Sequence, residues 1–146
     1  MAGQTVAVAE SLTGGAACVL LTQQPGASEA VRGAVVAYAT EIKSLVLDVD
    51  ADELARTGPV TARVALAMAL GVRSRLGADV GLATTGEAGP ESSSGAPVGT
   101  VFVAAVSPTG SWVRELALDG GRDEIRAASV AEVMKLGMTA LRGEPR

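Results

Sequence analysis

The stretch Val6-Ala7-Val8-Ala9-Glu10-Ser11-Leu12-Thr13-Gly14-Gly15 starts as a short apolar run and ends in a hydroxyl side chain followed by two glycines. Residues 5–9 are typical of a buried strand, and residues 14–23 form a mostly apolar segment typical of a helix. Ser11 therefore lies at a predicted strand-to-helix junction. Glycines at such a junction allow another group to approach the backbone closely.

The rest of the chain continues this alternation. The sequence predicts further strands and helices. Thr40 and Thr61 are expected to be the N-caps of two of these helices. The expected strands are 33–39, 80–85, 98–106 and 111–118, and the further helices are 40–47, 51–56, 62–76 and 122–141. This order predicts a three-layer α/β/α sandwich, with a mostly parallel sheet and an antiparallel hairpin at its edge. At 146 residues, the chain is expected to form a single domain, 1–146.

Three polar residues follow or end predicted strands: Ser11, Tyr38 and Thr85. Ligands of such sheets bind at the carboxyl ends of the strands. Lys43, on the first turns of the helix after Tyr38, is one of only two lysines, the other being Lys135. A serine, a lysine and a phenol are thus expected near one edge of the sheet.

The chain contains no histidine, which excludes a Ser-His-Asp or Cys-His triad and any zinc site that uses histidine. Nucleophilic chemistry must then transfer the proton to another group. The known alternative is a Ser-Lys pair, in which a lysine with a lowered pKa is the base.

The net charge of −4 and the pI near 4.8 argue against a nucleic-acid partner, although a few local arginines can still hold a small anion. No segment is typical of a membrane span or a secretion signal, so we expect a cytoplasmic protein. The lone Cys18 is expected to be buried and to form no intrachain disulfide. Hydrophobic residues make up 48% of the chain and aromatic ones only 2%, and this imbalance predicts a homo-oligomer.

Each motif also has a purely structural explanation. Ser11 or Thr13 can cap a helix, Tyr38 can end a strand, and Lys43 can be a solvated helical lysine. The glycine loop 85–90 lacks the full pattern of a phosphate-binding motif. Arg122 and Arg126 can pair with neighbouring carboxylates as readily as with a phosphate.

Taken together, the motifs resemble the CinA C-terminal domain family, which includes the nicotinamide-nucleotide amidohydrolases. The resemblance covers nearly the whole chain in order: AESLTGG, PGAS, VVAYATEIK, GPVT, TGEAGP, PVGTVF and GRDEIR. The chain differs from the family pattern at four positions, where Leu12 replaces a cysteine, Thr40 an asparagine, Glu87 a small apolar residue and Gly121 an aspartate.

The resemblance implies deamidation of nicotinamide mononucleotide to nicotinic acid mononucleotide and ammonia, without a metal or other cofactor. The residues that match the family's catalytic set are Ser11, Tyr38, Lys43 and Thr85. In this interpretation Lys43 takes the Ser11 proton directly or through the Tyr38 hydroxyl, and the N–H groups from Thr13 to Gly15 stabilise the oxyanion. The other residues expected to bind substrate are Gly14, Gly86, Gly89, Arg122 and Arg126, the arginines holding the 5′-phosphate. The alternative is a non-catalytic domain that binds a nucleotide or a partner in competence or DNA-damage systems.

Overall fold

The computed structural model describes residues 3–145, so residues 1–2 and 146 of the predicted domain lie outside it. Its centre is a five-stranded sheet in the order β2-β1-β3-β4-β5. The strands are β1 (Val6–Glu10), β2 (Val31–Val36), β3 (Val80–Gly86), β4 (Thr100–Ser107) and β5 (Gly110–Ala117). The helices are α1 (Ala16–Thr22), α2 (Ala27–Ala30), α3 (Thr40–Leu47), α4 (Ala51–Thr57), α5 (Ala62–Leu76) and α6 (Arg122–Arg142).

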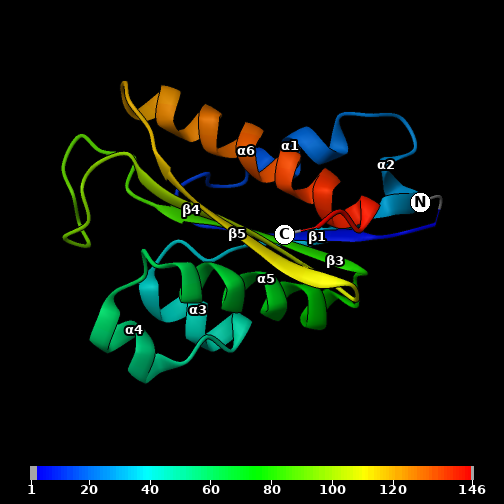
Figure 1. Ribbon diagram of the computed structural model, residues 1–146, viewed down its shortest axis with the longest axis horizontal. Helices are drawn as coiled ribbons and strands as arrows, with labels where there is room; N and C mark the ends of the chain where they lie inside the picture. The colour runs from blue at the N-terminus through cyan, green and yellow to red at the C-terminus, as the bar shows by residue number, and fades with distance from the viewer. Residues whose placement is uncertain (1–2, 146) are drawn as a thin grey trace.

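The strand directions confirm the predicted fold class. β1 pairs in parallel with β2 and with β3, whereas β4 pairs antiparallel with both β3 and β5. Four strands therefore run in one direction and only β4 opposes them. The carboxyl ends of β1, β2 and β3 meet at one edge of the sheet, which is the left-hand end in Figure 1.

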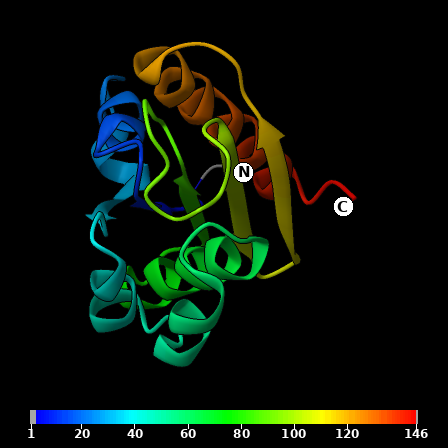
Figure 2. The same cartoon turned by 90° about the vertical axis from the view of Figure 1, so that its left-hand side faces the viewer.

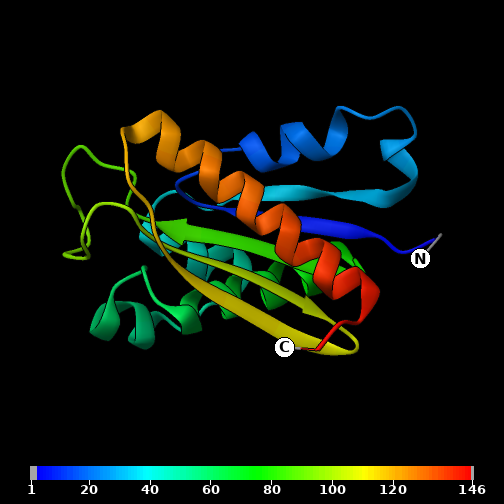
Figure 3. The same cartoon turned by 45° about the horizontal axis from the view of Figure 1, so that its top comes forward.

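Helices cover both faces of the sheet. α1 and α6 lie on one face, and α3, α4 and α5 lie on the other (Figures 2 and 3). The alternation of side chains along β1 divides them between two cores: Val6 and Val8 pack in the core under α6, and Ala7 and Ala9 in the core over α5.

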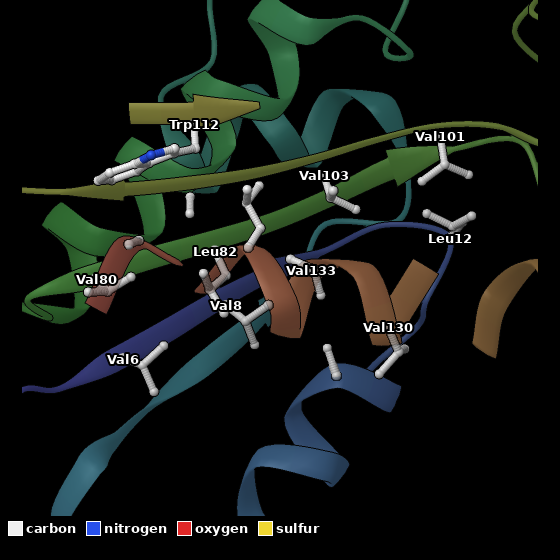
Figure 4. Packing of buried hydrophobic residues seen from close by; sticks show 14 of the residues in the cluster. Val6, Val8, Leu12, Val80, Leu82, Val101, Val103, Trp112, Val130 and Val133 are labelled. Atoms are coloured by element: carbon white, nitrogen blue, oxygen red, sulfur yellow. The ribbon is translucent and has the colours of Figure 1, made fainter. Parts of the chain in front are cut away.

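The core under α6 contains the larger side chains, among them Leu82, Val101 and Trp112 (Figure 4). Leu12 belongs to it as well, lying beside Val101 in Figure 4 with only 4% of its surface exposed. The residue directly after Ser11 thus anchors the β1–α1 loop in the core.

The core over α5 is built from smaller residues, and the α5 backbone lies very close to the sheet. A Cβ atom added at Gly81 would overlap the carbonyl oxygen of Ala69, and one added at Gly71 would overlap that of Leu47. Both glycines are therefore required by close backbone approach.

Most predicted elements are present with boundaries shifted by one or two residues, but the region before α3 differs. The predicted strand 33–39 is in fact β2, which ends at Val36, and the short helix α2 before it was not predicted. Tyr38 therefore follows the strand by two residues instead of ending it. Thr61 caps α5 as expected, its side chain accepting from the Val64 N–H, whereas Thr40 lies inside α3 and makes no side-chain cap.

Cys18 is only half-buried and packs against the core under α6, whereas we expected it to be fully buried. Among residues 3–145, none of the helices combines the length and the apolar character needed to cross a membrane.

Candidate active site

A cavity of about 360 Å³ opens at the carboxyl ends of β1 and β3. It has two sides. The strand side consists of Ser11, Lys43 and Thr85, and the loop side consists of the loop 87–99 together with Tyr38 and Arg122. In Figure 1 this loop projects beyond the left-hand end of the sheet, below the start of α6.

Ser11 and Lys43 are in direct contact on the strand side. The Lys43 Nζ lies 3.0 Å from the Ser11 Oγ and donates to the Ala37 carbonyl oxygen at 2.7 Å. Ser11 is 9% exposed and Lys43 only 1%, so the pair is shielded from bulk water. The hydroxyl and amine that the sequence placed near one edge therefore form a hydrogen-bonded pair at the cavity wall.

Burial lowers the pKa of the Lys43 ammonium to about 8, and the Glu41 carboxylate opposes this shift only partly. No carboxylate hydrogen-bonds to Nζ within residues 3–145; its two partners are the serine oxygen and the carbonyl. A neutral amine beside a serine hydroxyl has the properties of a general base.

The backbone around Ser11 is fixed by Glu10, whose side chain is fully buried. Its carboxylate accepts from the Ala17 N–H at 2.8 Å, from the Cys18 N–H at 3.0 Å and from the Thr13 hydroxyl at 2.6 Å. This carboxylate thus satisfies the second and third N–H groups of α1. Glu10 was not among the residues predicted to matter, although a charged residue at the end of an apolar strand is a signal that could have indicated its role.

Thr13, Gly14 and Gly15 differ from their expected role, because none of them lines the cavity. The Thr13 hydroxyl is used by Glu10 and by Thr84, 2.8 Å away, and the Gly14 N–H donates to the Ser11 carbonyl at 3.0 Å. Gly14 and Gly15 both have positive φ values, which the turn into α1 requires. These residues shape the loop behind Ser11.

Tyr38 lines the cavity but does not connect Ser11 to Lys43. Its hydroxyl accepts from the Arg122 Nη2 at 3.1 Å, and the side chain is well exposed. A proton relay through Tyr38 is therefore not needed, since Lys43 reaches Ser11 directly. Tyr38 belongs instead to the loop side.

The two arginines at the start of α6 have different surroundings. Arg122 lines the cavity, and its Nη1 donates to the Gly89 carbonyl at 2.7 Å. Arg126 does not line it: its Nε donates to the Leu12 carbonyl at 3.0 Å and its Nη2 to the Thr13 carbonyl at 3.4 Å. Only Arg122 is placed to meet a ligand, whereas Arg126 holds the loop after Ser11.

Thr85, Gly86 and Gly89 line the cavity as expected. The Thr85 hydroxyl, however, donates to the Pro59 carbonyl at 2.8 Å, so in this arrangement it is not directed to Ser11. A Cβ at Gly86 would lie 2.7 Å from the Thr100 carbonyl oxygen, which explains why only glycine fits at this turn.

Glu87 also lines the cavity and is 6% exposed. Burial tends to raise its pKa, but hydrogen bonds from Ser94 and Ser93 outweigh this effect and lower the pKa below the usual value. From the sequence, Glu87 was noted only as a departure from the family pattern.

Within residues 3–145, no three His, Cys, Asp or Glu side chains gather in a way that suits a metal ion.

Comparison with known proteins identifies the family. The family model described as the CinA C-terminal domain matches residues 1–141 of the sequence. The chain belongs to the CinA family. A CinA-like protein of Frankia casuarinae is 50% identical over 141 residues, which is 97% of this chain and 33% of that protein. A CinA-like protein of Thermosynechococcus vestitus is 46% identical over 137 residues, covering 91% of this chain and 33% of that protein.

The CinA fold is shared with solved structures. The competence/damage inducible protein CihA from Agrobacterium tumefaciens superposes with a TM-score of 0.91 at 35% identity, covering 95% of this chain and 86% of that one. The chain spans about a third of the length of the two CinA-like relatives compared above.

Proposed function

We propose that this CinA domain is an amidohydrolase that converts nicotinamide mononucleotide and water to nicotinic acid mononucleotide and ammonia. The observation that carries the proposal is the Ser11–Lys43 pair, buried at the wall of a cavity and separated by 3.0 Å. The family resemblance supplies the substrate, and the geometry supplies the nucleophile and its base.

In the proposed first step, neutral Lys43 takes the Ser11 proton as the serine oxygen attacks the carboxamide carbon. The Ala37 carbonyl supports this step, because it accepts one N–H of Lys43 and leaves the nitrogen lone pair for the serine. The protonated lysine then gives its proton to the leaving nitrogen, and ammonia departs. Water, deprotonated by Lys43, hydrolyses the acyl-enzyme and restores Ser11.

The developing oxyanion requires N–H donors on the cavity side of Ser11. We assign this role to the backbone N–H of Leu12, which directly follows the nucleophile, together with that of Ala88, which also lines the cavity. Within residues 3–145 neither group donates to another protein acceptor. This assignment replaces the donors from Thr13 to Gly15 that the sequence favoured.

The remote part of the nucleotide would contact the loop side. Arg122 is the guanidinium that lines the cavity and would bind the 5′-phosphate. The exposed ring of Tyr38 would offer an aromatic face to the positively charged pyridine ring.

The test is ammonia release from nicotinamide mononucleotide by the purified chain, measured beside its Ser11→Ala variant. The proposal expects release that depends on Ser11. If the original chain binds the nucleotide without releasing ammonia, the non-catalytic nucleotide-binding role takes its place.

A further inference from the structure

The loop 87–99 forms much of the loop side of the cavity. Glu87 connects the two ends of this loop through its backbone and contacts the middle of the loop through its side chain. The Glu87 N–H donates to the Thr100 carbonyl at 3.0 Å, and the Glu87 carbonyl accepts from the Gly99 N–H at 2.8 Å. These two bonds close the base of the loop. The side chain of the same residue then reaches the middle of the loop.

The Glu87 carboxylate accepts hydrogen bonds from two consecutive serines. Its Oε1 accepts from the Ser94 N–H at 2.7 Å and from the Ser93 N–H at 3.2 Å, and the Ser93 hydroxyl lies 3.1 Å from the same oxygen. A carboxylate that receives several such donors is a strong local anchor. Within the described residues, these are the hydrogen bonds that join the middle of the loop to a buried side chain.

The anchored segment faces the cavity beside the arginine that we assign to the phosphate. Ser93 lines the cavity, and Gly89, earlier in the same loop, accepts from Arg122 at 2.7 Å. Ser93 belongs to the same loop to which the Arg122 side chain is hydrogen-bonded, so the positions of these two residues depend on one loop. The Ser11–Lys43 pair has no hydrogen bond to this loop among residues 3–145.

We propose that Glu87 is a positioning residue that holds the segment 91–94 as the outer wall of the cavity and thereby determines affinity for the phosphate end of the substrate. The inference rests on the proposed amidohydrolase function for its kinetic part. Its structural part, the order of the loop, is independent of any activity.

The test combines hydrogen exchange with kinetics on the Glu87→Gln variant, which keeps the side-chain size and removes one acceptor oxygen and the charge. Amide exchange at Ser93 and Ser94 is expected to accelerate about tenfold or more, because both amides lose their charged acceptor. The KM for nicotinamide mononucleotide is expected to rise about tenfold with kcat within twofold. Constants for nicotinamide riboside, which lacks the phosphate, are expected to change less than twofold.

Glu91→Gln is the matched control for exchange, because Glu91 lines the same cavity and accepts no hydrogen bond from the loop within residues 3–145. It should leave the exchange rates of Ser93 and Ser94 unchanged. If Glu87→Gln does not fold, Ser93→Ala removes one donor alone and should change the same quantities in the same direction by a smaller factor.

Unchanged exchange at Ser93 and Ser94 in Glu87→Gln would overturn the inference, as would equal losses for both substrates. If the original chain releases no ammonia from either substrate, the proposed function fails. The exchange rates then decide the positioning role on their own.

Discussion

The two sides of the cavity are each organised by a buried glutamate, and the two glutamates act on different kinds of backbone. Glu10 accepts three hydrogen bonds from α1 and the turn before it. Leu12, in the same turn, is packed in the core. Glu87 accepts its hydrogen bonds from Ser93 and Ser94, in the largely exposed middle of a loop. The pair proposed to react therefore lies where the sheet and α3 form the cavity wall, and the groups proposed to select the substrate lie on the loop side.

The largest effect is expected from substitutions in the pair proposed to react, Ser11 and Lys43. Ser11→Ala and Lys43→Met should each lower kcat by on the order of a thousandfold or more, and the double variant should lose little beyond either single one, because nucleophile and base act as a unit. Steady-state ammonia release measures this. Lys135→Met is the control, since Lys135 is exposed and pairs with Glu132. A folded Lys43→Met enzyme that keeps most of its rate would contradict the Ser-Lys mechanism.

The next effect concerns stability and contrasts the two glutamates. Glu10→Gln should lower the free energy of unfolding by about 2 to 3 kcal/mol, because buried donors lose a charged acceptor. Glu87→Gln should cost less than about 1 kcal/mol, because the loop can open without unfolding the core. Urea unfolding of the three proteins measures both. Equal losses would show that the two sides are equally coupled to the fold.

A substitution of either arginine at the start of α6 separates the two sides by substrate. Arg122→Ala should lower kcat/KM for nicotinamide mononucleotide about tenfold to a hundredfold and leave nicotinamide riboside nearly unaffected, because one charged contact is worth roughly 1.5 to 3 kcal/mol. Arg126→Ala should instead affect both substrates alike, since Arg126 holds the loop after Ser11. Reversed patterns would move the phosphate contact to Arg126.

The pH dependence of the original enzyme tests the role of Lys43. Because the proposed mechanism needs the neutral amine, kcat/KM should rise about tenfold per pH unit up to a pKa of about 8 and then level off. The unfolded lysine keeps a proton that the folded one releases, so stability should also rise with pH between about 8 and 10.5, and Lys43→Met should abolish that rise. A profile that is flat between pH 6 and 9 would exclude Lys43 as the base.

The sequence predicted the fold class and the Ser11–Lys43 contact because both depend on patterns that the chain carries locally. Alternating apolar strands and helices determine the layers, and the ends of parallel strands bring Ser11 near the start of α3. It could not predict which donors were already used. The backbone from Thr13 to Gly15 was expected to supply the oxyanion donors, but these residues lie behind Ser11 and do not line the cavity, and the Thr13 hydroxyl contacts Glu10 and Thr84. Arg126 was expected to bind phosphate as Arg122 does, but its side chain donates to the Leu12 and Thr13 carbonyls. Such competition for hydrogen bonds is settled by tertiary structure: Thr13 and Thr84 are 71 residues apart in the sequence, and Arg126 and Leu12 are 114 residues apart.

The self-association expected from composition remains a prediction, and exposed apolar side chains on α1 and β2, among them Val19, Leu20 and Val36, support it.

Gly71 and Gly81, where α5 approaches neighbouring backbone closely, have a consequence for the shape of the cavity. With no side chain at Gly71 or Gly81, α5 packs directly against the backbone of α3 at Gly71 and of β3 at Gly81. Pro59 and Val60, just ahead of this helix, line the cavity. A single methyl group added at Gly71 or Gly81 would displace α5, and the displacement would reach the cavity through Pro59 and Val60 without changing any residue that lines it.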